Sequence, residues 1–107
     1  MEPKMINIAR DFSPFAAGRY DSDGPWSGQK FREKFLKPAL SKFDKVVVEL
    51  DGTVGLGSSF LEESFGGLVR VEGFDKDVLK NKLEIVCKQS SYINKIWKYI
   101  SDANPAK

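Results

Sequence analysis

Residues 45–51 constrain the fold of this chain more than any other segment. Their centre, Val46-Val47-Val48, is a run of β-branched apolar residues without polar alternation. A run of this kind is typical of a strand that is covered on both faces, as in the parallel sheets of α/β proteins. The segment therefore predicts a central strand in a sheet with helices packed on it.

The remaining sequence alternates strands with helices. Further strands are predicted at 5–9 and 83–87, and residues 16–20 are a candidate for one more short strand. The spacing of apolar residues predicts helices at about 27–43, 59–68, 75–79 and 91–100. Because a connection that returns through a helix joins parallel neighbours, this order indicates parallel strand pairs. We expect one α/β domain over residues 1–107, with its core at about 5–101 and a mixed sheet of about four strands.

Two residues shape the first long helix, and apolar spacing defines the core. Ser27 is a good N-cap, because its hydroxyl can accept a hydrogen bond from a free N–H of the first turn. Pro38 lies inside the same helix and either kinks it or starts a second short helix. The predicted core residues are Ile6, Ile8, Phe31, Phe35, Leu40, Val46, Val48, Leu50, Phe60, Leu61, Phe65, Leu68, Leu83, Ile85, Ile96 and Trp97.

The composition excludes several kinds of catalytic site. The chain has no histidine and one cysteine, Cys87. It therefore has no Ser-His-Asp or Cys-His nucleophile and no zinc site built from several Cys or His ligands. A lone thiol in a buried-strand pattern is expected in the core and suits a reducing cytoplasm. No apolar run approaches the roughly 20 residues that span a membrane. We expect a cytoplasmic protein that is not an enzyme and that uses no cofactor or metal.

The end of the central strand is the best candidate for a functional site. Asp51 ends the strand, a glycine-rich loop with Gly55 and Gly57 follows, and Ser58 and Ser59 begin a helix. Ligands of α/β proteins gather at the carboxyl ends of strands, and free N–H groups at a helix start attract anions. The layout therefore suits a phosphate or a phosphorylated serine. It is not a nucleotide P-loop, which requires a lysine directly after its last glycine.

The two serines are expected to differ in role. Ser59 and Glu62 have the S-x-x-E spacing of a capping box, in which both side chains hold backbone N–H groups of the first turn. Ser58 would then lie just outside the helix, exposed to solvent. Glu62 and Glu63 are also favourable charges near a helix start.

Gly66 and Gly67 lie inside the same predicted helix. Two glycines there cost roughly 1.5–2 kcal/mol relative to alanine. We therefore expect them to permit a close approach, either to the sheet or to another chain.

Charge is divided unevenly along the chain, although the net charge is only +2. Residues 30–45 carry six basic and two acidic side chains, whereas residues 51–77 carry two basic and six acidic ones. The basic helix is either a solvated face or a footprint for an acidic partner or nucleic acid. Its candidate contact residues are Lys30, Arg32, Lys34 and Lys37.

Arg19 follows Gly18 beside an acid-rich loop. Its guanidinium can form an ion pair with Asp21 or Asp23, or it can contact an anion or a partner. The sequence favours the ion pair, because both carboxylates are close along the chain.

Three stretches resemble the STAS-like domain family of unknown function: residues 18–20, 23–32 and 58–68. The family contains small bacterial and phage-associated proteins that are related in fold to anti-anti-sigma factors. The resemblance extends over roughly residues 5–88. It implies a STAS-like fold and a non-enzymatic, regulatory role in protein–protein interaction.

In anti-anti-sigma STAS domains, a partner kinase of the GHKL ATPase type phosphorylates a serine at a helix start. By position, Ser58 matches that serine, although Gly57 replaces the preceding Asp and Phe60 the following Gly. The resemblance thus implies partner switching at Ser58 or Ser59. The surrounding candidate partner-binding residues are Asp51, Gly55, Gly57, Glu62, Glu63, Gly66 and Gly67.

Two other interpretations come from different functional classes. The alternative is a nucleic-acid-binding accessory domain that uses the basic helix at 30–45. A third is a hydrolase in which Asp51 and Glu62 or Glu63 hold a divalent cation, which requires these carboxylates to converge.

Overall fold

Three parallel strands form the sheet of the computed structural model, which describes residues 2–105. The strands are β1 (Lys4–Asn7), β2 (Val46–Glu49) and β3 (Leu83–Val86), in the order β1-β2-β3. Ile6, Val48 and Ile85 lie side by side in the parallel register. The predicted parallel pairing of the central and last strands is confirmed, and β2 is the central strand.

The expected mixed sheet of about four strands is not found in the described residues, because residues 16–20 form no strand. Gly18 has a φ of +90°, which breaks an extended conformation. Two carbonyls of the segment accept hydrogen bonds from the next helix, Gly18 O from Gly28 N (2.9 Å) and Arg19 O from Gln29 N (3.0 Å). The segment therefore supports the start of a helix instead of extending the sheet.

Two long helices each contain a wider, π-helical turn. The first consists of α1 (Gly28–Phe31), η3 (Arg32–Leu36) and α2 (Lys37–Lys42), and the second of α3 (Ser58–Leu61), η4 (Glu62–Gly66) and α4 (Gly67–Arg70). The remaining helical elements are η1 (Ile8–Phe12), η2 (Asp21–Asp23), α5 (Lys76–Lys82) and α6 (Ser90–Asp102). Ser27 caps α1 as predicted, since its Oγ accepts from Lys30 N at 3.1 Å. The chain stays helical through Pro38, which is the second residue of α2, and η3 ends two residues before it.

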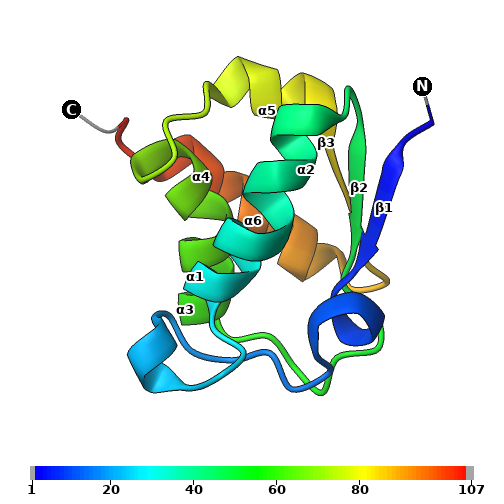
Figure 1. Cartoon of the computed structure of the whole chain (residues 1–107), viewed down its shortest axis with the longest axis vertical. Coiled ribbons are helices and arrows are strands. Elements are labelled where there is room, and N and C mark those ends of the chain that lie inside the picture. Colours follow the sequence, from blue (N-terminus) through cyan, green and yellow to red (C-terminus); the bar gives the residue numbers. More distant parts are fainter. Residues whose placement is uncertain (1, 106–107) are drawn as a thin grey trace.

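The hydrophobic core lies between the helices and one face of the sheet (Figure 1). All predicted core residues are buried except Phe35 and Trp97, which are half-buried and pack against the core. The ring of Phe12 packs against the rings of Trp26 and Phe31, with distances between ring centroids of 5.5 Å and 5.2 Å. The helices and strands thus share one core and form a single compact domain.

The sheet is covered unevenly. All three residues of Val46-Val47-Val48 are buried, as a central strand requires. The labelled helices nevertheless lie on one side of the three strands (Figure 1). The expectation that helices cover this strand on both faces is therefore wrong for the outer face.

Candidate functional site

The loop after β2 is tied to the loop after β3. The Asp51 carboxylate accepts from the backbone N–H of Lys88 at 3.1 Å. Asp51 and Cys87 border a shallow pocket of about 210 Å³ at this edge of the sheet. Cys87 is half-buried, and burial, with a smaller contribution from Asp51, raises the pKa of its thiol. Asp51 therefore holds two loops together.

Both serines at the start of α3 are exposed. The helix begins at Ser58, and Gly57 is the capping position, so Ser59 lies inside the helix. No side chain caps this helix, and the Glu62 carboxylate binds arginines. The predicted capping box is therefore wrong, and Ser58 and Ser59 are both exposed.

Two exposed apolar side chains lie on the loop that leads to the serines and on the loop hydrogen-bonded to it. Phe15 is 67% exposed and Val54 is 79% exposed. The hydrogen bond from Val54 N to Pro14 O, at 2.9 Å, holds their two loops together. We call Phe15, Val54, Ser58 and Ser59 the switch surface. In the sequence, the exposure of Phe15 and Val54 is indicated by their position in loops that contain Pro or Gly, outside any periodic apolar pattern.

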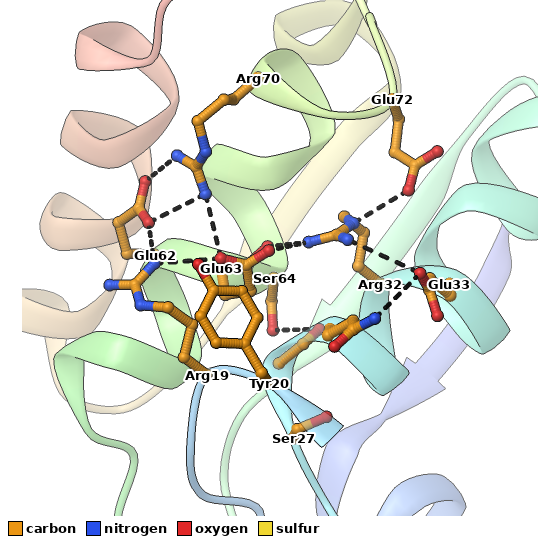
Figure 2. A network of polar contacts seen from close by, with 12 residues as sticks. Arg19, Tyr20, Ser27, Arg32, Glu33, Glu62, Glu63, Ser64, Arg70 and Glu72 are labelled. Carbon is orange, nitrogen blue, oxygen red and sulfur yellow. Dashed lines mark hydrogen bonds and ion pairs between the residues drawn. The ribbon is translucent and has the colours of Figure 1, made fainter. Parts of the chain in front are cut away.

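Glu62 lies between two arginines from different parts of the chain (Figure 2). Arg19 Nη1 is 2.5 Å from Glu62 Oε1, and Arg70 Nη1 is 2.5 Å from Glu62 Oε2. Both arginines also reach Glu63 Oε1, at 3.1 Å and 3.2 Å. The Arg19 guanidinium is thus not paired with Asp21 or Asp23 as expected. Only its backbone N–H donates to Asp23 Oδ2, at 3.1 Å.

Arg32 completes this network from the other side of Glu63 (Figure 2). Arg32 is only 2% exposed to solvent. Arg32 Nη1 donates to Glu63 Oε2 at 2.5 Å and to Glu63 O at 2.8 Å, and Nε donates to Glu72 Oε2 at 3.0 Å. Three arginines and three glutamates therefore balance one another in a network that runs from the buried Arg32 and Glu63 to the half-buried Arg19 and Arg70. We call these residues the arginine network: Arg19, Arg32, Glu62, Glu63, Arg70 and Glu72.

Gly66 and Gly67 make room for the arginine network. A Cβ at Gly67 would collide with the Arg32 guanidinium and lie 3.1 Å from its Cδ. A Cβ at Gly66 would lie 2.5 Å from Glu62 Oε2 and 3.4 Å from the carbonyl oxygen of Tyr99 on α6. The expected close approach is thus to these side chains and to α6, and not to the sheet.

Several predicted contact residues are inside the domain. Glu63, Gly66 and Gly67 are buried, so they do not line a surface that a partner can reach. Arg32 is also buried, which removes it from the surface proposed for nucleic acid. Of its neighbours, Lys30 is half-buried and Lys34 exposed. Lys37 Nζ lies 3.2 Å from Glu72 Oε1, with which it forms an ion pair. Gly55 and Gly57, in contrast, are exposed on the loop that leads to Ser58.

The electrostatics of Glu62 follow from its position between arginines. Burial raises its pKa, but the hydrogen bonds from Arg70 and Arg19 together outweigh burial and lower the pKa below its usual value. The hydrogen bonds to Glu62 raise the pKa of both guanidinium groups. The carboxylate therefore stays ionised and bound to both arginines at neutral pH.

The acidic residues do not form a metal-binding cluster. Among residues 2–105, no three Asp, Glu or Cys side chains gather closely enough to hold a metal ion. Asp51 contacts Lys88, whereas Glu62 and Glu63 bind arginines. The convergence that the hydrolase interpretation requires is therefore not present. None of the helices between residues 2 and 105 has the length and apolar composition that a membrane crossing requires.

A family model described as "STAS-like domain of unknown function (DUF4325)" matches residues 27–91. The chain belongs to this STAS-like family. The matched residues begin at the cap of α1 and include β2, both serines and every member of the arginine network except Arg19. The resemblance inferred from the sequence is thus confirmed. No curated protein and no solved structure matches the chain significantly.

Replacing Arg32 by methionine should destabilise this STAS-like domain strongly. Removing one member of a buried ion pair costs about 3–5 kcal/mol, because the other charge stays buried. We expect Arg32→Met to lower the free energy of unfolding by that amount in urea titrations. Lys34→Met, at an exposed position of the same helix, should change it by less than about 0.5 kcal/mol. Equal stability of the two variants would show that Arg32 does not hold the helices together.

The contribution of Glu62 to stability should disappear in acid. A group whose pKa is lowered by folding contributes stability above its unfolded pKa and loses it as the pH falls through the folded value. The difference in unfolding free energy between wild type and Glu62→Gln should therefore be constant well above pH 4.5, the usual value, and shrink below it. Urea unfolding over a pH series measures this difference. A pH-independent difference would rule out the ion pairs as its source.

Proposed function

We propose that this STAS-like domain is a non-enzymatic regulatory module that binds a partner protein through the switch surface. The observation that carries the proposal is the combination of two exposed serines with two exposed apolar side chains on adjoining loops. Large apolar side chains that remain in water are costly, and clusters of them mark interaction sites. Ser58 and Ser59, four and five residues after Val54 at the end of the same loop, supply hydroxyls at which a partner enzyme could change the charge.

Phosphorylation of Ser58 or Ser59 would switch this surface. A phosphate adds about −1.5 to −2 charges at neutral pH, and a helix start tolerates them. The same charge would oppose an apolar contact at Phe15 and Val54, because a docked partner would have to desolvate it. Modification would therefore release a partner without unfolding the domain.

The surrounding backbone supports access by a large partner. Side-chain space at Gly55 and Gly57 is open, with no heavy atom within 4 Å of a Cβ placed at either residue. A kinase active site could therefore approach the chain next to Ser58. By the resemblance to anti-anti-sigma STAS domains, we propose a GHKL-type ATPase as the kinase and a cytoplasmic location for both proteins.

Removing the two apolar side chains should abolish partner capture. The wild-type protein, immobilised and incubated with an extract of the source organism, should capture a GHKL-type ATPase. The double variant Phe15→Ser/Val54→Ser should capture about tenfold less of it. The matched control is Val71→Ser/Val78→Ser, because these valines are also exposed but lie near α4 and on α5. All three proteins should melt at similar temperatures. Equal capture by the two double variants would exclude the switch surface as the docking site.

A charge at Ser58 should have the effect of phosphorylation. With the captured ATPase, Ser58→Asp should weaken binding, whereas Ser58→Ala should leave folding and binding unchanged, since this hydroxyl caps no helix. Incubation with ATP, followed by mass spectrometry, should place phosphate on Ser58 or Ser59. Wild-type affinity of Ser58→Asp, together with no phosphate on either serine, would exclude the switch.

A further inference from the structure

The first long helix and the edge strand β1 border an open groove of about 280 Å³, which shares no residue with the switch surface. Phe35, Ala39 and Phe43 line it at intervals of four residues, so they follow one another along the same side of the helix and its end. Ile6 of β1 lines the groove from the sheet. The inner part of the groove is therefore apolar.

Three lysines surround this apolar lining, and we call the site the lysine groove. Lys34 and Lys42 lie four residues before and after Pro38, which also lines the groove, and Lys4 lies on β1. All three lysines are exposed, and no carboxylate between residues 2 and 105 forms an ion pair with them. Lys37 of the same helix, in contrast, is paired with a glutamate. Three positive charges thus gather at one groove, although the net charge of the chain is only +2.

The neighbouring carboxylates do not neutralise the lysine groove. None of the Asp and Glu side chains in the described part of the chain lines it. Asp11 and Glu33 each contact an arginine instead, at 3.1 Å and 3.9 Å. Glu2 and Asp44 occupy exposed positions outside the lining. The groove therefore combines an apolar interior with a rim of one charge sign.

We propose that the lysine groove docks an acidic segment of a partner protein. An apolar side chain of that segment would cover the half-buried rings of Phe35 and Phe43, and its carboxylates would lie beside the lysines. Complementary charges of this kind steer association and select the partner. The volume of the groove is just below the roughly 300–1,000 Å³ of pockets that enclose a whole small ligand, so the groove suits an anchoring side chain of a larger molecule.

The aromatic rings favour a peptide over single-stranded nucleic acid, whose bases stack on open ring faces. The Phe35 ring stacks on Phe31, with ring centroids 5.7 Å apart, and Lys42 Nζ lies over the Phe43 ring, 5.9 Å from its centroid. One face of each ring is thus already covered. Among the described residues, the lining also contains no arginine, the side chain whose planar guanidinium matches a phosphate with two hydrogen bonds.

Peptide display tests the proposal. Random peptides of about ten residues, displayed on phage, are depleted on Lys34→Glu/Lys42→Glu and then selected on the immobilised wild type. The selected peptides should carry several acidic residues beside a large apolar one, and they should bind Lys34→Glu/Lys42→Glu about tenfold more weakly than the wild type. The matched control Lys80→Glu/Lys95→Glu changes the net charge equally at exposed positions of α5 and α6 and should bind them as the wild type does. All three proteins should melt at similar temperatures.

Changes in a selected peptide separate the two parts of the groove without altering the domain. Serine in place of the apolar residue, or glutamine in place of the acidic ones, should each weaken binding about tenfold. Titration of the original peptide should move the amide chemical shifts of β1, η3 and α2, and not those of the switch surface.

Several results would overturn the proposal. They are the absence of any peptide that distinguishes the wild type from Lys34→Glu/Lys42→Glu, a selected set without acidic residues, and chemical-shift changes confined to another surface. An oligodeoxythymidine of equal charge that binds more tightly and displaces the peptide would instead assign the groove to single-stranded nucleic acid. Each of these results leaves the proposed function untouched, because that function uses a different surface.

Discussion

The buried guanidinium of Arg32 is the interaction on which the rest of the structure depends. It lies on the first long helix and binds Glu63 of the second, as well as Glu72 after the second helix ends. A charge so deeply buried is tolerated only when it is paired and fully hydrogen-bonded. The relative positions of the two helices are therefore set by this geometry, in addition to apolar packing.

The local features around Arg32 follow from this requirement. Both long helices widen to a π-helical turn where the arginine network crosses between them, with Lys37 N–H reaching Arg32 O and Gly67 N–H reaching Glu62 O. Gly67 leaves the space that the guanidinium occupies. Because these helices lie on one face of the sheet, the other face stays open.

Much of the fold could be predicted from local patterns. The apolar run at Val46-Val47-Val48 identified the central strand, because β-branched apolar residues in succession are typical of a buried strand in a parallel sheet. Ser27 was predicted as a cap because its hydroxyl bonds a backbone group only three residues away. Most predicted core residues followed from periodicity and are buried, whereas Phe35 and Trp97 are half-buried and Leu36, Leu79 and Ile100 were not in the predicted core. The motifs at 58–68 were also specific enough to identify the family, since family membership is a property of sequence.

The sequence by itself thus determined the three strands that form the sheet, but not the absence of a strand at 16–20, and it determined the long helices, the family and the glycine-rich loop that ends in two serines. Only the tertiary structure decided what the charged side chains do. From the sequence, Glu62 and Glu63 were expected to act locally, as favourable charges at a helix start. In the structure, their carboxylates bind Arg19, which lies more than 40 residues away along the chain. Glu62 forms these ion pairs in place of the capping box, because charge-assisted hydrogen bonds in a part-buried site are stronger than a solvent-exposed cap. Such partners are chosen by how the helices pack, and no spacing within one helix encodes that choice.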